Sequence, residues 1–289
     1  MIRKELKMYN VLSRIGILLI LAISVASCGN NGSDAGEGLL TEAENAITSG
    51  DFLQAYCLID SINVVSKDNI ELRKRALHLR TIADEKAGIA DSIVNDSVLR
   101  AETARVEALR NSFKFIKTKD MVEGYTVHKK AAPLVQRTGI DVRINEQNEL
   151  YIVSLLRGVN IKHTQISATV NGTTATSSNV PYNGSTNYRF KDEGVENEMV
   201  TFRGAKADSL CMLISDNPGA KVVLTFIGSS RHKVNLSAAE AKIIADTYNY
   251  SQALQRKKKS EGLALYYANK ISIARKQQAA TQPTNKEYK

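Results

Sequence analysis

The sequence contains no tryptophan, and aromatic residues of all kinds make up only 6% of its 289 residues. Aromatic side chains are the usual stacking platforms for sugars and bases, so their scarcity counts against a protein built around such stacking. The presence of only 4 prolines and 17 glycines excludes a collagen-like or proline-rich chain. Hydrophobic residues make up 43% of the chain, which is enough for a folded core and excludes wholesale disorder.

The N-terminal segment has the pattern of an export signal. Four basic residues among the first 14 are followed by an uncharged apolar run from Ile15 to Val25. This run is shorter than the roughly 20 residues that cross a bilayer as a helix. A basic segment followed by a short apolar run is typical of a secretory signal peptide, which we place at residues 1–27. A buried helix is the alternative.

The tetrapeptide Val25-Ala26-Ser27-Cys28 resembles the lipobox of bacterial lipoproteins. In that family the cysteine thiol receives a diacylglycerol and the chain is cut before the cysteine. The resemblance implies lipidation at Cys28 and a membrane anchor, to which each buried methylene contributes about 0.8 kcal/mol. Gly29, in place of an aspartate, resembles the pattern of outer-membrane lipoproteins, so we expect an envelope protein of the outer membrane. Residues 28–38 are rich in glycine and asparagine and predict a flexible tether.

Two cysteines remain besides Cys28. An oxidising envelope permits a disulfide between them. However, Cys57 lies in a helical pattern, whereas Cys211 lies in a strand pattern far along the chain. We therefore favour two separate thiols.

The first part of the mature chain has helical periodicity. Residues 39–65 predict a helical hairpin that turns at Ser49-Gly50, and residues 66–120 predict one long helix. The apolar seam of the long helix is incomplete, so the helix needs a partner.

Between residues 121 and 236 the hydrophobic period changes to two. Ile140 to Ile144 alternates strictly, and Asn171-Gly172 and Asn183-Gly184 are hairpin turn signals. Further short β-rich runs follow, among them Leu210 to Ile214. This segment predicts a β-sandwich-like domain with no intervening helix.

A second long helix is predicted over residues 237–278, because Ser237 and Glu240 form a capping box at its start. Residues 279–289 predict a polar, disordered tail.

The fold class is therefore α+β, with a helical hairpin and long coiled-coil-like helices flanking an antiparallel β-sandwich or open barrel. We predict that the two long helices pair antiparallel within one chain; the alternative is that each pairs with its copy in a dimer. The apolar residues expected in that seam are Leu72, Leu79, Ile82 and Ile89 on one helix and Leu254, Leu263, Tyr266 and Ile271 on the other.

This order of segments resembles envelope lipoproteins of the Bacteroidetes, in which the β-rich region closes with a motif like Thr225-Phe226-Ile227-Gly228. Bacteria of that group attach O-linked glycans at Asp-(Ser/Thr)-aliphatic triplets. The resemblance implies four candidate acceptors, of which we expect one or two to be used: Ser61, Ser92, Ser97 and Ser209.

Motifs for catalysis or cofactor binding are missing from the sequence. The four histidines are separated from one another, and no metal-binding motif, nucleophile elbow or phosphate loop occurs. The acidic strip from Asp192 to Glu198 is more typical of a solvated loop than of a cation site. We therefore predict no catalytic residue, no metal and no cofactor.

The run Arg256-Lys257-Lys258-Lys259 is the densest positive charge in the chain. Export argues against nucleic acid as its partner, and contact with anionic lipid headgroups or surface glycans is the functional interpretation. A solvated helix face is the simpler one.

Together these patterns predict a membrane-anchored envelope lipoprotein that is a non-enzymatic scaffold or binding module. One alternative is a glycan- or peptide-binding component of a surface uptake complex, in which Tyr151, Tyr182 and Tyr188 replace the missing tryptophans. A second alternative is an envelope hydrolase. The expected partners are the membrane, through the lipid anchor, and envelope proteins or glycans, but not nucleic acid.

Overall fold

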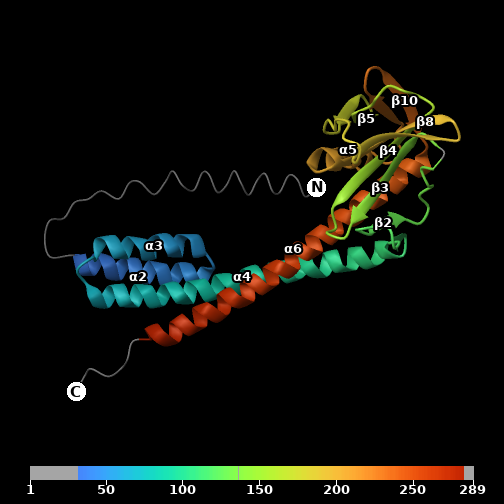
Figure 1. The fold of residues 1–289 in the computed structure, drawn as a ribbon. Helices are drawn as coiled ribbons and strands as arrows, with labels where there is room; N and C mark the ends of the chain where they lie inside the picture. Colours follow the sequence, from blue (N-terminus) through green and yellow to red (C-terminus); the bar gives the residue numbers. More distant parts are fainter. Residues whose placement is uncertain (1–31, 136, 283–289) are drawn as a thin grey trace. The chain divides into compact units, whose positions relative to one another are not determined.

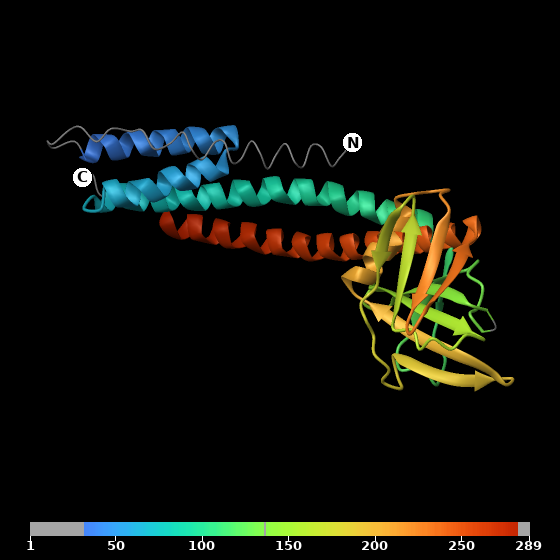
Figure 2. The same ribbon diagram turned by 90° about the horizontal axis from the view of Figure 1, so that it is seen from above.

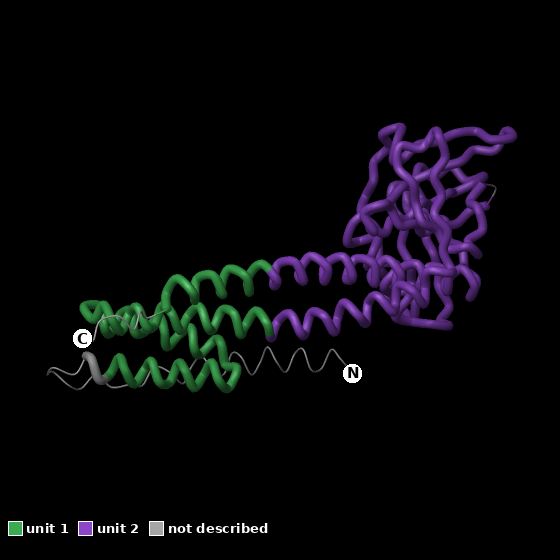
Figure 3. Tube along the Cα trace, turned by 90° about the horizontal axis from the view of Figure 1, so that it is seen from below, with its two compact units in different colours: residues 1–89, 269–289 green, residues 90–268 purple. Residues whose placement is uncertain are grey.

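The computed structural model describes residues 32–282 except residue 136. It confirms the α+β class, with antiparallel sheets and long helices on either side of them in the sequence (Figure 1). The chain divides into two compact units, residues 1–89 with 269–289 and residues 90–268 (Figure 3). The helices are α2 (Gly32–Ser49), α3 (Phe52–Val65), α4 (Ile70–Arg110), α5 (Ala205–Ser215) and α6 (Ala238–Thr281), and α4 and α6 each contribute to both units.

In the first unit, α2 and α3 form the predicted hairpin. Gly50 makes the turn with a φ of +82°, which favours glycine, and the Asp51 side chain caps α3 by accepting from the backbone N–H of Gln54. The apolar faces of both helices pack on the first half of α4. Their core comprises Leu40, Ala43, Ala46, Ile47, Ala55, Ile59, Ile62, Leu72, Ala76, Leu79 and Ala83.

Helix α2 begins earlier than the sequence predicted. Residues 32–38, which we assigned to the flexible tether, are helical. A Cβ on Gly36 would overlap Ser66 and Leu72, so only glycine permits this close approach. Glu37 also pairs with Arg75 at 2.6 Å. These contacts hold the start of α2 against the start of α4. The remainder of the predicted tether, with Cys28, lies outside the described residues.

Helix α4 ends at Arg110, well before the predicted end at residue 120. The chain turns at Asn111-Ser112 and enters strand β1 (Phe113–Ile116). Phe113 stacks on Tyr250 of α6, with ring centres 4.3 Å apart, and this burial of two aromatic rings favours the strand over a longer helix.

The second unit contains two antiparallel sheets (Figure 2). The six-stranded sheet has the order β1-β2-β3-β4-β8-β7, and the four-stranded sheet has the order β10-β9-β5-β6. The remaining strands are β2 (Tyr125–His128), β3 (Gly139–Asn145), β4 (Leu150–Arg157), β5 (Gln165–Val170), β6 (Thr173–Thr176), β7 (Asn187–Asp192), β8 (Val195–Arg203), β9 (Val222–Ile227) and β10 (Arg231–Leu236).

One hydrophobic core joins the two sheets with α5 and the start of α6. Ile152 and Phe202 of the six-stranded sheet share this core with Leu224 and Phe226 of the four-stranded sheet. Ile244 of α6 is buried in the same cluster. The residues 121–236 that we assigned to the β-domain therefore need β1 and the first turns of α6 to complete their sheet and core.

The prediction of a strand at Leu210 to Ile214 is wrong, because these residues lie in α5. Ala207, Leu210, Cys211 and Ile214 follow helical spacing and are all buried in the core. A short apolar run fits either a strand or a buried helix, and here the spacing decides. Both described cysteines are free, Cys57 exposed and Cys211 buried, and burial raises the pKa of the Cys211 thiol.

Of the two predicted hairpin turns, one is confirmed. Asn171 and Gly172 both have positive φ and join β5 to β6. Asn183-Gly184 forms a turn within a loop and joins no paired strands. Glu193-Gly194, which the sequence analysis missed, makes the β7–β8 hairpin with φ values of 52° and 80°.

Helix α6 starts with the predicted capping box. The Ser237 hydroxyl accepts from the Glu240 backbone N–H at 3.2 Å, and the Ser237 backbone N–H donates to the Glu240 carboxylate at 2.9 Å. The helix continues past the predicted end at residue 278 to Thr281, so the first residues of the expected tail are helical. The tail from residue 283 onward lies outside the described residues.

Within each unit, α4 and α6 pair antiparallel. In the first unit Glu85 contacts Arg275 at 2.6 Å, and in the second unit Glu102 contacts Arg256 at 2.7 Å. The Asn95 amide also donates to the Ser260 carbonyl at 2.9 Å. These contacts confirm pairing within one chain.

The apolar seam differs from the predicted one. Leu72 and Leu79 pack on the α2–α3 hairpin instead of on α6. Ile89 is 37% exposed and Tyr266 is 58% exposed. The seam relies more on polar contacts and small residues such as Ala253 and Ala274 than periodicity indicated.

Cysteines at Glu102 and Arg256, in a chain whose native cysteines are replaced, should crosslink within one chain under a short bifunctional reagent. Cysteines at Asp91 and Arg256 are the control, because position 91 lies about 16 Å along the helix from position 102. On denaturing electrophoresis, the first pair should give a crosslinked product with the mass of a monomer. The control pair should give no crosslinked product. Crosslinks exclusively between chains would contradict this pairing.

Candidate functional site

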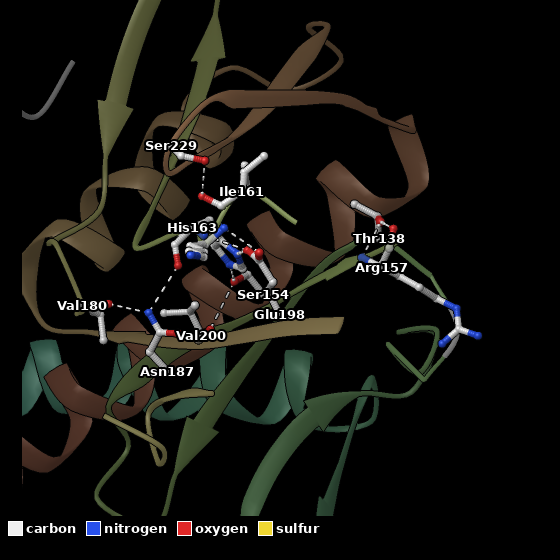
Figure 4. A network of polar contacts seen from close by, with 11 residues as sticks. Thr138, Ser154, Arg157, Ile161, His163, Val180, Asn187, Glu198, Val200 and Ser229 are labelled. Atoms are coloured by element: carbon white, nitrogen blue, oxygen red, sulfur yellow. Dashed lines mark hydrogen bonds and ion pairs between the residues drawn. The ribbon is translucent and has the colours of Figure 1, made fainter. Parts of the chain in front are cut away.

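A chain of buried hydrogen bonds joins Ser154, His163 and Glu198 inside the second unit (Figure 4). The Ser154 hydroxyl lies 2.8 Å from Nε2 of His163, and Nδ1 of His163 lies 2.8 Å from the Glu198 carboxylate. The connectivity is that of the serine–histidine–acid triad of acyl-transfer enzymes. The sequence analysis missed it because the three residues come from two strands and a loop.

Local backbone geometry sets the position of His163. Lys162 has a φ of +53°, and this turn aims the backbone N–H groups of Lys162 and His163 at the Glu198 carboxylate at 2.6 and 2.7 Å. Gly228 approaches so closely that a Cβ there would overlap the Ile161 carbonyl oxygen. Phe226 packs edge-on against the His163 ring at 5.2 Å. Phe226 and Gly228 both belong to the motif at 225–228, whose role is therefore to seat this turn.

Burial decides what this network can do. Ser154 and His163 are 0% exposed and Glu198 is 2% exposed, so a substrate does not reach the Ser154 hydroxyl in this structure. Burial opposes ionisation of Glu198, but its hydrogen bonds from the His163 ring and from the two backbone N–H groups outweigh that effect and lower its pKa. The arrangement is therefore a buried polar crosslink of the core.

Replacing Glu198 with glutamine should lower the free energy of unfolding by about 3 kcal/mol at neutral pH, because it removes charge-assisted hydrogen bonds from a buried site. A carboxyl with a lowered folded pKa stabilises above its unfolded value of about 4.3, and this stabilisation disappears as the pH falls through the folded value. The difference between wild type and Glu198→Gln should therefore shrink below about pH 4.

Denaturant melts across pH measure this difference. Glu196→Gln on the same strand is the control, because its exposed pair with Lys191 is worth at most about 1 kcal/mol. A Glu198→Gln variant as stable as wild type at pH 7 would contradict the crosslink.

A cleft lies on the opposite, outer face of the six-stranded sheet. It has a volume of about 420 Å³ and is lined by residues of β1, β2, β3, β4, β7 and β8 and of the segment 131–135. Its apolar lining comprises Ile116, Val127, Leu134, Val135, Leu155 and Met199, with the aromatic rings of Tyr125 and Phe190. Five charged side chains also line it: Lys114, Asp141, Arg143, Arg157 and Asp192.

A row of alternating tyrosines and arginines crosses the same face. The Arg143 guanidinium lies 4.2 Å from the centre of the Tyr125 ring, and that of Arg203 lies 4.4 Å from the Tyr151 ring. Strand register places Arg143 beside Tyr151 and Tyr151 beside Arg203. Burial raises the pKa of Tyr151, although Arg143 opposes the effect. These contacts fix the aromatic rings in place before any ligand arrives.

The acidic strip at 192–198 is engaged with protein partners. Asp192 and Glu193 pair with Arg157 at 3.2 and 3.8 Å, and Glu196 pairs with Lys191 at 3.0 Å. Within residues 32–282, apart from residue 136, no group of three or more metal-ligating side chains gathers.

All four candidate glycan acceptors lie in helices. Ser61 is exposed on α3, Ser97 is exposed and Ser92 half-buried on α4, and Ser209 is exposed on α5. The hydroxyls of Ser61, Ser97 and Ser209 donate to backbone carbonyls of the preceding turn. Modification at these positions stays a prediction.

The basic run on α6 is partly neutralised. Arg256 pairs with Glu102, and Lys257 pairs with Glu261 at 2.5 Å. Lys258 and Lys259 remain exposed, and neither has an ion-pair partner in the described part of the chain. Any contact with an anionic surface would rest on these two lysines.

Comparison with known proteins finds no match to a family model, to a curated protein or to a solved structure. Within the described residues, no helix is long and apolar enough to span a bilayer. The function is therefore argued from the geometry and from the export pattern of the sequence.

Proposed function

We propose that the protein is a lipid-anchored lipoprotein of the bacterial cell envelope, attached to the outer membrane through Cys28, and that it is a non-enzymatic binding module. The observation that carries the binding role is the preformed cleft of about 420 Å³ on the outer face of the six-stranded sheet. This volume is in the range of small-molecule and peptide sites. The anchor rests on the resemblance of Val25 to Cys28 to a lipobox.

The lining of the cleft favours a peptide over a glycan. The three tyrosines that could replace the missing tryptophans, Tyr151, Tyr182 and Tyr188, are not among the residues that line it. Arg203 also lies over the Tyr151 ring, and Arg189 lies over the Tyr182 ring. A peptide with an apolar side chain fits the floor of Leu155 and Met199 and leaves its polar backbone to the charged residues of the lining. The hydrolase alternative lacks support, because the triad-like contact found among the described residues is buried.

Cys28→Ser should leave the protein unprocessed or soluble, because the thiol that accepts the lipid is gone. Cell fractionation and detergent phase partition measure the change. Cys57→Ser, at an exposed position on α3, is the control and should remain with the membranes. Normal processing and detergent partition of Cys28→Ser would refute the lipid anchor.

Met199→Arg should block the cleft, because it places a charge on the apolar floor. Peptides selected from a displayed library against the soluble Cys28→Ser chain should bind this variant about tenfold more weakly or worse in titration. Thr174→Arg, on the exposed edge strand β6 of the other sheet, adds the same charge away from the cleft and should bind normally. The peptide assignment would be overturned if both variants lost the same peptide affinity. It would also be overturned if the protein bound glycans on an array but no selected peptides.

A further inference from the structure

A second cavity in the same unit, separate from the peptide cleft, has a strongly cationic lining. It has a volume of about 470 Å³ and lies where the end of α4, the end of β2 and the first turns of α6 meet. Lys129, Lys130 and Lys242 line it, with Asp246 as the one carboxylate among the lining residues. The sequence analysis did not find this cluster, because Lys242 follows Lys129 and Lys130 only after all the remaining strands.

The charges at this cavity do not balance. Lys242 pairs with Asp246 through both carboxylate oxygens, at 3.0 and 2.9 Å, which neutralises that pair. Lys129 and Lys130 are exposed, and neither side chain has an ion-pair partner among the described residues. Two positive charges beside one cavity repel each other, and a bound anion would relieve this repulsion.

His128 supplies a hydrogen-bond donor at the wall of this cavity. The residue is only 5% exposed, and its Nδ1 accepts from the Lys130 backbone N–H at 3.1 Å. In the neutral ring the proton therefore lies on Nε2. Among the described residues Nε2 has no hydrogen-bond acceptor, since its nearest carboxylate oxygen, on Asp246, lies 3.8 Å away. This N–H is open to the cavity that His128 lines, where it can donate to a ligand.

The charge state of His128 fits this role. Burial lowers the pKa of His128; Asp246 opposes the effect, and Lys130 and Lys242 add to it. The ring therefore stays neutral near pH 7 and offers one N–H donor. Ala239, Lys242, Ile243 and Asp246 line the cavity along one side of α6.

We propose that this cavity binds a phosphate group, held by Lys129 and Lys130 and by the Nε2–H of His128. Lys242, fixed by Asp246, completes the positive wall. The cavity volume of about 470 Å³ is more than a phosphate ion needs. The ligand is therefore a phosphate ester with a small organic part, carried either by a soluble molecule or by a lipid headgroup.

The test uses the full chain with Cys28→Ser, so that no lipid anchor obscures binding. Glycerol 3-phosphate and inorganic phosphate are titrated by calorimetry, and the His128 ring is followed by NMR. Vesicles of phosphatidylcholine, with and without phosphatidylglycerol, test the lipid source. We expect saturable binding of one ester source, with a shift of the His128 signals.

The double variant Lys129→Gln/Lys130→Gln should weaken binding about tenfold or more. Lys258→Gln/Lys259→Gln removes the same charge from the exposed face of α6 and should change the affinity less than about twofold. His128→Asn retains an acceptor for the Lys130 backbone N–H, but its shorter side chain no longer brings an N–H donor to the ligand. This variant should also weaken binding, and thermal melts should show that it is folded.

Binding of glycerol 3-phosphate alone would identify a soluble ester, and binding only to phosphatidylglycerol vesicles would identify a headgroup. The site would be overturned if neither glycerol 3-phosphate nor the phosphatidylglycerol vesicles bound saturably. It would also be overturned if the two double lysine variants lost the same affinity. The Met199→Arg cleft variant should bind the phosphate probes normally. The phosphate site and the peptide cleft are therefore tested separately.

Discussion

The packing of the second unit depends on the close approach of the chain at His163 to Gly228. Ser154 and Glu198 lie on neighbouring strands of the six-stranded sheet, whereas Phe226 and Gly228 lie at the end of β9 in the four-stranded sheet. The turn at 161–163 touches both, so one small set of polar contacts and one glycine tie the two layers together. These contacts fix the distance between the two sheets, and the large apolar residues of the shared core fill the space between them.

The same contact shows why chemical identity alone is a poor guide to function. Serine, histidine and glutamate stand in the order of a catalytic relay, yet the burial that strengthens their hydrogen bonds also keeps substrate away. The accessible chemistry lies elsewhere in this unit, in a cleft with an apolar floor and in a cavity with a cationic wall. Both point to recognition by shape and charge.

Local signals in the sequence predicted the elements better than their ends and partners. The α2–α3 hairpin, the capping box at Ser237 and the turn at Asn171-Gly172 each depend on a few adjacent residues, and each is confirmed. The end of α4 was missed because it depends on the stacking of Phe113 on Tyr250, which lies far along the chain. Helix α5 was missed because the run from Leu210 to Ile214 is apolar throughout, and so short a run fits a buried strand as well as a buried helix. The cationic cavity was missed for the same reason as α4, since Lys130 and Lys242 meet only in three dimensions.

The position of α6 in the chain has a consequence for folding. Every strand precedes α6, yet Ile244 completes the core between the sheets and Tyr250 completes the packing of β1. A ribosome delivers this helix last, so the sheets stay incompletely packed until the final segment of the chain has been made.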